Sequence, residues 1–326
     1  MKKLSAILLA VTVLFLLTGC SFSLYQREAE SRDIYKEFIA TDIDAADDYA
    51  ARVSEKSGAA VVSVIANSVI RTNSGNYSST QIFSGIIINA EGYVLTTSNA
   101  ALLQVSSGRH VYSNKVMSAY AVLSAAYNDT THYRLTLVDY DASLGLALFR
   151  FYDQFHYYTD ASKNSSVDGF QFTARFSEED VSAGDRCVSV GNSLGNALNA
   201  DTSAPGSVDE IALTIMSGIV SDDEAGAEEL APVTFGGKDY GYILTTAPLN
   251  IDMYGGALFD ENGYLIGLLA LKIGYQSTST GECGYFKRVG AACRVELLTA
   301  YIDSVADEIR SPIPYTVASA SNGEVA

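Results

Sequence analysis

Short apolar and β-branched runs, separated by polar turns, make up most of the chain after residue 58. We expect strands over residues 59–69, 82–89, 93–96, 109–112, 119–126, 133–139, 146–151, 186–190, 211–220, 242–245, 257–259 and 265–273. Turn-forming sequences such as Asn89–Gly92 separate several of them. About a dozen short strands at this spacing favour barrels or sandwiches over alternating strand–helix units.

Only residues 296–309 carry a convincing helical pattern. The apolar face of this helix consists of Leu297, Leu298, Tyr301, Ile302, Val305 and Ile309. Pro312 and Pro314 end the helix, and we expect the remaining tail to be disordered. Polar composition predicts loops at 72–80 and 160–169.

The N-terminal segment has the pattern of a secretory signal. Lys2 and Lys3 precede an apolar run over residues 4–17, which is shorter than the roughly 20 residues of a membrane-spanning helix. The following Leu17–Cys20 segment, Leu-Thr-Gly-Cys, resembles the bacterial lipobox, which implies cleavage before Cys20 and a diacylglyceryl group on it. The alternative is an ordinary signal peptide. We expect an exported protein, lipid-anchored to the bacterial cell membrane, with its domain on the extracytoplasmic side.

The segment that follows, to about Lys56, is polar and acidic. Ile34, Phe38, Tyr49 and Val53 recur there at loosely helical spacing. We interpret it as a membrane spacer that ends in a weak amphipathic helix.

Charge and cysteine content exclude several classes of protein. The formal net charge of -17 argues against nucleic acid as a partner. Besides Cys20, the cysteines are Cys187, Cys283 and Cys293, which allow at most one disulfide and do not have zinc-site spacing. We expect them to be buried, and we expect no metal and no cofactor.

Five segments, in order along the chain, resemble the HtrA/Deg type of trypsin-like serine protease. They are Ser84–Thr96, Asp141–Leu148, Gly184–Gly195, Ser217–Ser221 and Gly263–Gly267. Each match is weak by itself, and together they are specific. The resemblance implies an all-β, chymotrypsin-like fold of two six-stranded antiparallel β-barrels with a C-terminal helix, and a cleft between the barrels.

The domain boundaries expected from this resemblance are as follows. A signal peptide covers 1–19 and an acidic tether 20–58; the protease-like domain covers 59–310, with barrels at about 59–165 and 166–295; a disordered tail covers 311–326. The family often carries a PDZ domain after the barrels. Only about fifteen residues follow the helix here, so we expect the PDZ domain to be absent.

The resemblance places the catalytic histidine, aspartate and serine at Asn99, Gly145 and Tyr254. It places the oxyanion-hole backbone at Asp252 and Tyr254. Hydroxyl-based acyl transfer needs a base and a group that orients it, and an amide and a glycine supply neither. Tyr254 is a phenol with an ordinary pKa near 10, so it is a poor nucleophile at neutral pH. The carboxylate of Asp252 would disfavour a developing oxyanion. We expect no catalytic residues at this site.

Other constellations are weaker. The segment Gly191–Gly195 has the spacing of a nucleophile elbow around Ser193, but an elbow needs a following helix and a later histidine. The chain's histidines, His110, His132 and His156, all precede it, and we interpret them as surface or packing residues. Nothing in the spacing supports a dyad of one of them with Ser98.

An acidic run at 222–224 and 228–229 has no calcium-loop pattern, and we interpret it as a solvated loop.

Three hypotheses about function remain. The first is an anchored pseudoprotease that binds an unknown peptide or protein in the inter-barrel cleft. The second is an active serine endopeptidase or other hydrolase with a rearranged site. The third is a structural envelope protein. We favour the first, which makes the chain a non-enzyme.

Overall fold

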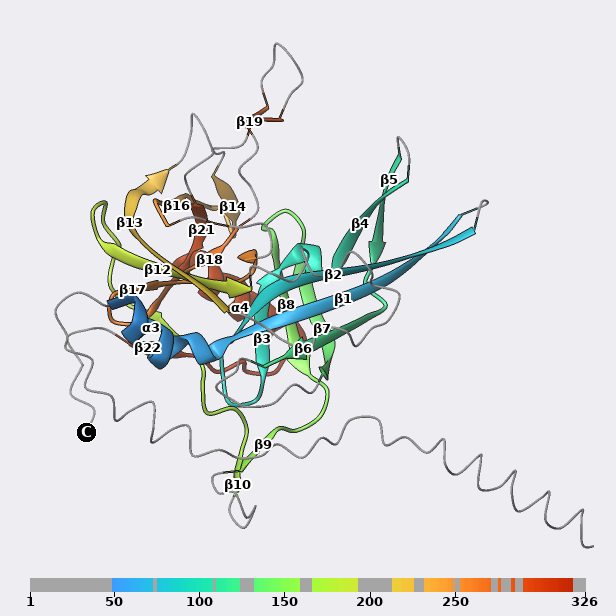
Figure 1. The fold of residues 1–326 in the computed structure, drawn as a ribbon, viewed down its shortest axis with the longest axis horizontal. Helices are drawn as coiled ribbons and strands as arrows, with labels where there is room; N and C mark the ends of the chain where they lie inside the picture. The colour runs from blue at the N-terminus through green and yellow to red at the C-terminus, as the bar shows by residue number, and fades with distance from the viewer. Residues whose placement is uncertain are drawn as a thin grey trace, which may run out of the picture.

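The computed structural model describes residues 49–72, 75–107, 110–123, 132–158, 166–192, 213–225, 232–247, 249, 253–270, 275–276, 283–284 and 290–318. In these residues strands dominate and form two closed six-stranded antiparallel barrels that lie side by side (Figure 1). The all-β double-barrel fold expected from the sequence is therefore confirmed.

The first barrel has the strand order β1-β2-β3-β8-β7-β6. Its strands are β1 (Val61–Thr72), β2 (Gly75–Ile87), β3 (Tyr93–Thr97), β6 (Ser118–Val122), β7 (His132–Asp141) and β8 (Leu146–Phe151). The turn at Gly92 between β2 and β3 has φ +79°, a conformation that suits glycine.

Strand β8 of the first barrel is almost entirely apolar because both of its faces are buried. In β8, Leu146 and Leu148 belong to a core that the two barrels share, whereas Ala147 and Phe149 fill the interior of the first barrel. Successive side chains of a strand point to opposite faces. A continuous apolar run is therefore required where one face lines the barrel and the other meets its neighbour.

The second barrel closes through β17, which pairs with both β12 and β18. Its strands are β12 (Arg186–Asn192), β13 (Leu213–Ala225), β16 (Tyr242–Thr245), β17 (Ala257–Asp260), β18 (Leu265–Leu269) and β21 (Gly290–Arg294). β13 extends further than the sequence pattern predicted, so the acidic residues 222–224, expected in a loop, lie in its irregular end. Backbone pairing with β16 holds these residues extended despite their polar side chains.

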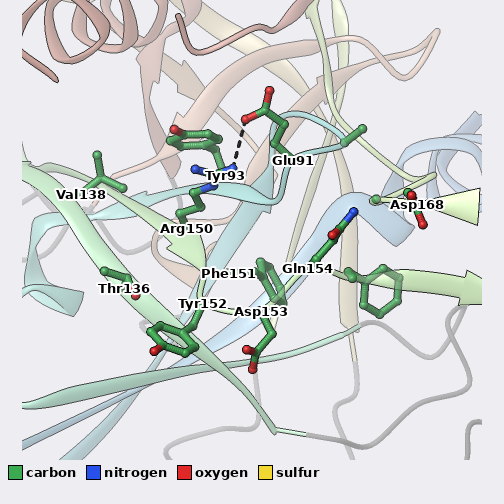
Figure 2. Close-up of a pocket in the computed structure, with 13 residues that line it drawn as sticks. Glu91, Tyr93, Thr136, Val138, Arg150, Phe151, Tyr152, Asp153, Gln154 and Asp168 are labelled. Atoms are coloured by element: carbon green, nitrogen blue, oxygen red, sulfur yellow. Dashed lines mark hydrogen bonds and ion pairs between the residues drawn. The ribbon is translucent and has the colours of Figure 1, made fainter. Parts of the chain in front are cut away.

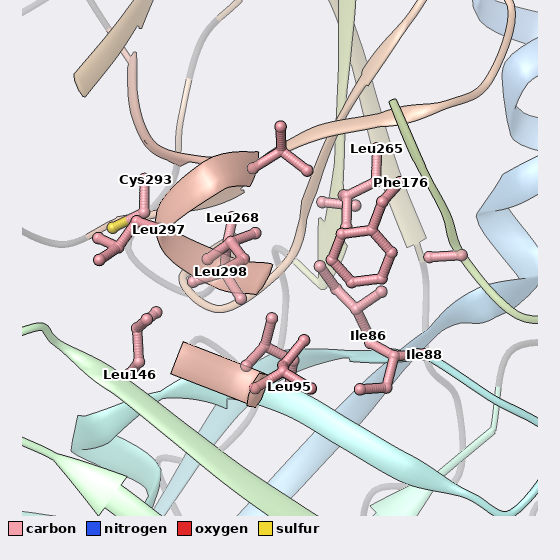
Figure 3. Packing of buried hydrophobic residues seen from close by; sticks show 14 of the residues in the cluster. Ile86, Ile88, Leu95, Leu146, Phe176, Leu265, Leu268, Cys293, Leu297 and Leu298 are labelled. Atoms are coloured by element: carbon pink, nitrogen blue, oxygen red, sulfur yellow. The ribbon is translucent and has the colours of Figure 1, made fainter. Parts of the chain in front are cut away.

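The shared core lies where the barrels meet α4 (Val295–Ile309) (Figure 3). Leu95 and Leu146 come from the first barrel, Leu268 from the second, and Leu298 from the helix. The Tyr301 hydroxyl of the helix also donates a hydrogen bond to the first barrel, at 3.0 Å to Asp139 Oδ2 on β7. The helix expected at 296–309 is therefore confirmed, and it stabilises the two barrels against each other.

The stretch 72–80, expected as a loop, is mostly strand. β1 and β2 continue their ladder to the pair Thr72 and Gly75, and this hairpin projects beyond the barrel (Figure 1). A second hairpin, β4 (Leu102–Ser107) and β5 (His110–Lys115), lies beside it, and the Ser68 hydroxyl donates to the Lys115 carbonyl at 3.2 Å. Polar residues can form these strands because the ladder depends on backbone groups, which every residue except proline supplies in full.

Part of the expected disordered tail is also ordered. β22 (Thr316–Ala318) pairs in parallel with β11 (Arg175–Ser177), and Ile313 is buried. The Asn89 side chain donates to the Pro314 carbonyl at 2.8 Å. The two prolines end the helix as expected. The chain after the helix is ordered because Ile313 is buried and β22 pairs with β11, and composition alone does not predict either contact.

At the other end, α3 (Tyr49–Ser57) and the short η1 (Gly58–Ala60) pack on the second barrel. Val53 is buried, the Tyr49 hydroxyl donates to the Gly218 carbonyl at 3.1 Å, and Ser57 Oγ donates to the Gly263 carbonyl at 2.7 Å. The weak helix expected here is confirmed for its last two turns. The signal segment with Cys20, the rest of the tether, and the end of the tail at 319–326 lie outside the described residues.

The remaining short elements are η2 (Ser98–Ala100), β9 (His156–Tyr158), β10 (Ser166–Asp168), β14 (Val233–Phe235), β15 (Lys238–Tyr240), β19 (Tyr275–Gln276) and β20 (Cys283–Gly284). Cys187 and Cys293 are buried, as expected. In the part of the chain that the structure describes, no helix has the length and apolarity needed to cross a membrane.

Candidate functional site at the junction of the barrels

Asn99 lies in η2, the short turn that follows β3. The Thr97 hydroxyl caps this turn and accepts from the Asn99 amide at 3.4 Å. Asn99 is half-buried, between the buried Ser98 and Ala100. The turn forms here because an apolar strand ends in Thr and Ser, which cap short helices.

Gly145 lies directly beside this turn. The Ser98 amide donates to the Gly145 carbonyl at 2.9 Å, so two of the three positions that the resemblance assigned to the triad lie on adjoining segments. Gly145 has φ +76°, and a Cβ built on it would meet no atom within 4 Å. A side chain is therefore disfavoured here by backbone strain and not by lack of space.

Asp141 shapes the turn that contains Gly145. Its Oδ1 accepts from the amides of Ser143 and Leu144 at 2.7 and 3.1 Å, and its carbonyl accepts from the Gly145 amide at 3.0 Å. Partial burial favours the neutral carboxyl, but the hydrogen bonds from Ser143 and Leu144 outweigh burial and lower the pKa of Asp141. The carboxylate at this turn is occupied in holding the backbone.

Tyr254 lies in the tight loop before β17. Its carbonyl accepts from the Ser84 amide of the first barrel at 2.9 Å. The next residue, Gly255, has φ +84°, and a Cβ there would lie 2.3 Å from the Ser84 carbonyl oxygen and 2.9 Å from the Thr97 amide. The loop of Tyr254, the third assigned position, thus lies against the end of β3, next to the turn that carries Asn99.

Ser84 and Thr96 are residues whose part in this site the sequence did not predict. Both are fully buried, and the Thr96 hydroxyl donates to the Ser84 carbonyl at 2.6 Å. That hydroxyl would also be 2.4 Å from a Cβ on Gly255. In the sequence, these residues could have been noticed as polar positions within a largely apolar hairpin. In the structure they form a buried polar pair that positions the loop of Tyr254.

Two predicted positions lie outside the described residues. Asp252, assigned to the oxyanion hole, is one, and Ser193 of the possible elbow is the other. Gly191 is described: a Cβ there would lie 2.9 Å from the Met253 Cα, so the end of β12 packs directly on the Tyr254 loop.

None of the three histidines lies in the segments that form the site. His132 begins β7, about 30 Å along that strand from Asp141 at about 3.3 Å per residue. His110 pairs with Ser107 at the far end of the β4–β5 hairpin. His156 follows the far end of β8 and pairs with Asp168.

The site therefore offers an amide, a bare backbone position and a phenol. An amide does not take up a proton near neutral pH, and a phenol without a base is a weak nucleophile. Among the described residues, His, Cys, Asp and Glu side chains form no group suited to a metal ion. What the arrangement retains is a rigid backbone junction with one aromatic side chain.

Residues 83–268, more than half of the chain, match the family described as trypsin-like peptidase domain, and the chain belongs to this family. Two similar solved structures are of a variant of the HtrA-type protease AlgW, one with a decapeptide and one with a tripeptide. They are 18% and 19% identical to this chain and cover 79% and 80% of it, with TM-scores of 0.52 and 0.51. The chain covers 67% and 64% of those structures. No curated protein sequence matches it.

Proposed function

We propose that this protein is a lipid-anchored, extracytoplasmic relative of HtrA-type proteases that binds a peptide or protein at the junction of its barrels without cleaving it. The observation that carries the proposal is the convergence of Asn99, Gly145 and Tyr254 on one junction. The fold is that of the trypsin-like peptidase family, and the three positions that the resemblance assigns to the triad carry none of the groups that acyl transfer requires.

The backbone of the junction supports a binding role. The Ser84–Tyr254 hydrogen bond ties the loop to β2, and the Ser98–Gly145 hydrogen bond ties the two turns to each other. A preformed site loses little conformational freedom on binding. The HtrA-type structures that share this fold were determined with a decapeptide and a tripeptide, which makes a peptide our choice of ligand class.

A fluorophosphonate probe on the purified wild-type protein tests the absence of catalysis. We expect no covalent labelling, with an active trypsin-like protease in the same experiment as the positive control. Labelling of any serine, located by mass spectrometry, would mean that a rearranged hydrolase site exists and that the proposal is wrong.

A photo-crosslinking amino acid tests the binding role. Benzoylphenylalanine in place of Tyr254 is expected to crosslink the bound peptide or protein at the junction. The same amino acid in place of Met117, which is 67% exposed in the turn between β5 and β6, is the matched control. Equal crosslinking patterns from both positions would contradict a site at the junction.

The anchor is tested separately. Cys20→Ser is expected to abolish labelling by a fatty-acid analogue and to release the protein from the membrane fraction. A Cys20→Ser protein that stays fully membrane-bound would rule out lipidation as the anchor, and it would leave the junction proposal to its own experiments.

A further inference from the structure

Residues 49–60, which we call the N-terminal strap, lie on the second barrel but lead directly into the first (Figure 1). α3 contacts β12 and β13, and η1 continues without a spacer into β1. The first residue of β1, Val61, donates its amide to the Gly58 carbonyl. Val53 of the strap is 1% exposed and belongs to the core that the barrels share. The strap therefore joins the two barrels.

The first contact of the strap reaches the chain that leads into the loop of Tyr254. The Tyr49 hydroxyl donates to the Gly218 carbonyl at 3.1 Å. Gly218 in turn lies so close to Ala247 that a Cβ on it would be 2.3 Å from the Ala247 amide nitrogen. Tyr49 thus fixes the part of β13 against which the approach to the loop rests.

A second contact reaches the loop from β12. A Cβ on Gly58 would lie 4.0 Å from Val190 Cγ1, so the strap rests against the end of that strand. The same end packs on the loop. A Cβ on Gly256 would lie 2.4 Å from the Val190 carbonyl oxygen, and a Cβ on Gly191 would lie 2.9 Å from the Met253 Cα. One strand end therefore lies between the strap and the loop.

The third contact is to the turn between β17 and β18. Ser57 Oγ donates to the Gly263 carbonyl at 2.7 Å, and Lys56 Nζ donates to the Asn262 carbonyl at 3.0 Å. β17 begins at Ala257, directly after the loop of Tyr254. The strap thus holds the segments before, beside and after this loop.

Few contacts keep the strap docked. α3 has nine residues, of which Val53 and Ser57 are buried. Isolated helices shorter than about 12–15 residues are marginal in water, so this helix depends on its docking site. Segments with few buried apolar contacts open at a lower free energy than the core. We therefore expect the strap to undock before either barrel unfolds.

We propose that the N-terminal strap is a latch on the loop of Tyr254. The docked strap holds the loop in the conformation described above, and undocking loosens the loop while both barrels stay folded. The chain that precedes Tyr49 enters the domain through the strap, so a pull on that chain acts on the latch. That the junction binds a peptide rests on the function proposed above, whereas the latch is tested on the loop itself, so each can fail without the other.

Hydrogen–deuterium exchange of single amides in the full chain tests the latch. The Gly255 amide donates to the Leu269 carbonyl and the Gly256 amide to the Met253 carbonyl, both at 2.9 Å, so these two amides report on the loop. The double variant Tyr49→Phe/Ser57→Ala removes two hydrogen bonds of the strap. Because loop opening follows undocking, we expect both amides to exchange about tenfold faster, the scale of two lost hydrogen bonds.

An amide remote from the junction is the internal reference. The Phe151 amide donates to the Gly92 carbonyl at 3.0 Å, at the other end of β3. This end borders a depression of about 700 Å³ on the first barrel, whose lining includes Glu91, Asp153 and Asp168 (Figure 2). We expect the exchange rate of the Phe151 amide to change less than about twofold in the double variant.

Two control variants separate the latch from a general loss of stability. Arg52→Ala changes an exposed position of α3 and leaves both hydrogen bonds of the strap in place. Tyr301→Phe removes a hydrogen bond of α4, outside the strap. Each is expected to change exchange at Gly255 and Gly256 less than about twofold relative to Phe151. A rise in Tyr301→Phe equal to that in the double variant would refute the latch.

The amides of α3 show in the same experiment whether the strap has undocked. Val53→Asp, which places a charge at a buried position, is the stronger release of the strap. If α3 exchanges faster in either variant while the Gly255 and Gly256 amides do not, the strap does not hold the loop and the latch is refuted. If neither variant speeds exchange in α3, the strap is not the weakly docked segment that the latch requires, and the latch is refuted as well.

Discussion

Substituting Gly255 by alanine tests whether the loop of Tyr254 is held by close packing against the first barrel. The residue has φ +84°, and an added Cβ would lie 2.3 Å from the Ser84 carbonyl oxygen and 2.4 Å from Thr96 Oγ1. The first of these atoms is backbone within a paired strand, so it cannot move without disturbing the barrel. Gly255→Ala must therefore shift the loop, the strand, or both.

The expected cost has two parts. A left-handed conformation costs an L-residue about 1–2 kcal/mol, and an added methyl group in a packed interior costs about 1–3 kcal/mol more. The Ser84–Tyr254 hydrogen bond, which lies beside the overlap, contributes part of the second figure. Gly255→Ala should thus lower the free energy of unfolding by about 2–5 kcal/mol.

Gly237→Ala is the matched control for this prediction. Gly237 has φ +79° in the exposed turn between β14 and β15, and a Cβ there would meet no atom within 4 Å. It carries the backbone cost alone, about 1–2 kcal/mol. Urea denaturation of both variants should separate them by about 1–3 kcal/mol, the cost of crowding. Equal losses would refute the claim that the junction is closely packed at Gly255.

Three further predictions concern the interactions that support the site. Tyr301→Phe should lower the free energy of unfolding by about 1–2 kcal/mol in urea denaturation, because it removes the 3.0 Å hydrogen bond to Asp139; no loss would mean that this bond does not stabilise the barrel pair. Burial raises the pKa of Cys187 to about 11. The negative charge of Asp185 adds to this shift, and the hydrogen bond with Thr245 opposes it. The thiol is thus favoured in the folded state, and its contribution of about 2–3 kcal/mol is present below pH 9 and lost as pH rises towards 11. Over this pH range, the free energy of unfolding should decline less in Cys187→Ala than in the wild-type protein. Equal declines in the two proteins would contradict the raised pKa of Cys187. Asp141→Ala should cost about 1 kcal/mol at pH 7; because the pKa of Asp141 is lowered, the difference should shrink as pH falls below 4, and a pH-independent difference would argue against the carboxylate as the acceptor.

A variant that restores Asn99→His, Gly145→Asp, Tyr254→Ser and Asp252→Gly is expected to recover little peptide hydrolysis. Gly145 has φ +76°, so an aspartate at this position would have a strained backbone. Its side chain would leave the backbone in a different direction from that of an aspartate with a negative φ. Cleavage of a fluorogenic peptide at rates typical of active trypsin-like proteases would show that the site differs from a working one only by its side chains.

Many strands that border the core could be predicted from the sequence, but two were missed: β21, a buried strand of the second barrel, and β11, which contains the buried Phe176. Residues 146–151 read as a strand because both faces are buried, one inside the first barrel and one against the second. The helix at 296–309 was equally clear, since its apolar face has the helical period. The order of five short segments along the chain led to the family, because each segment holds a turn or strand that the fold requires.

Elements stabilised by backbone pairing alone were not predictable from composition. The β1–β2 hairpin beyond Ser68 and the strand β22 carry polar or mixed sequences, and only a neighbouring strand makes them extended. The same holds for the buried polar pair of Ser84 and Thr96. Their burial depends on a loop more than 150 positions away along the chain.

The sequence by itself determined which chemical groups occupy Asn99, Gly145 and Tyr254, because side-chain identity needs no coordinates. Tertiary structure decided that these three positions adjoin one another, that Gly145 has a left-handed backbone, and that the histidines belong to other parts of the fold. It also brought Glu91, Asp153 and Asp168 around one depression. The physical reason is that barrel closure joins segments distant in sequence, and local patterns carry no record of that closure.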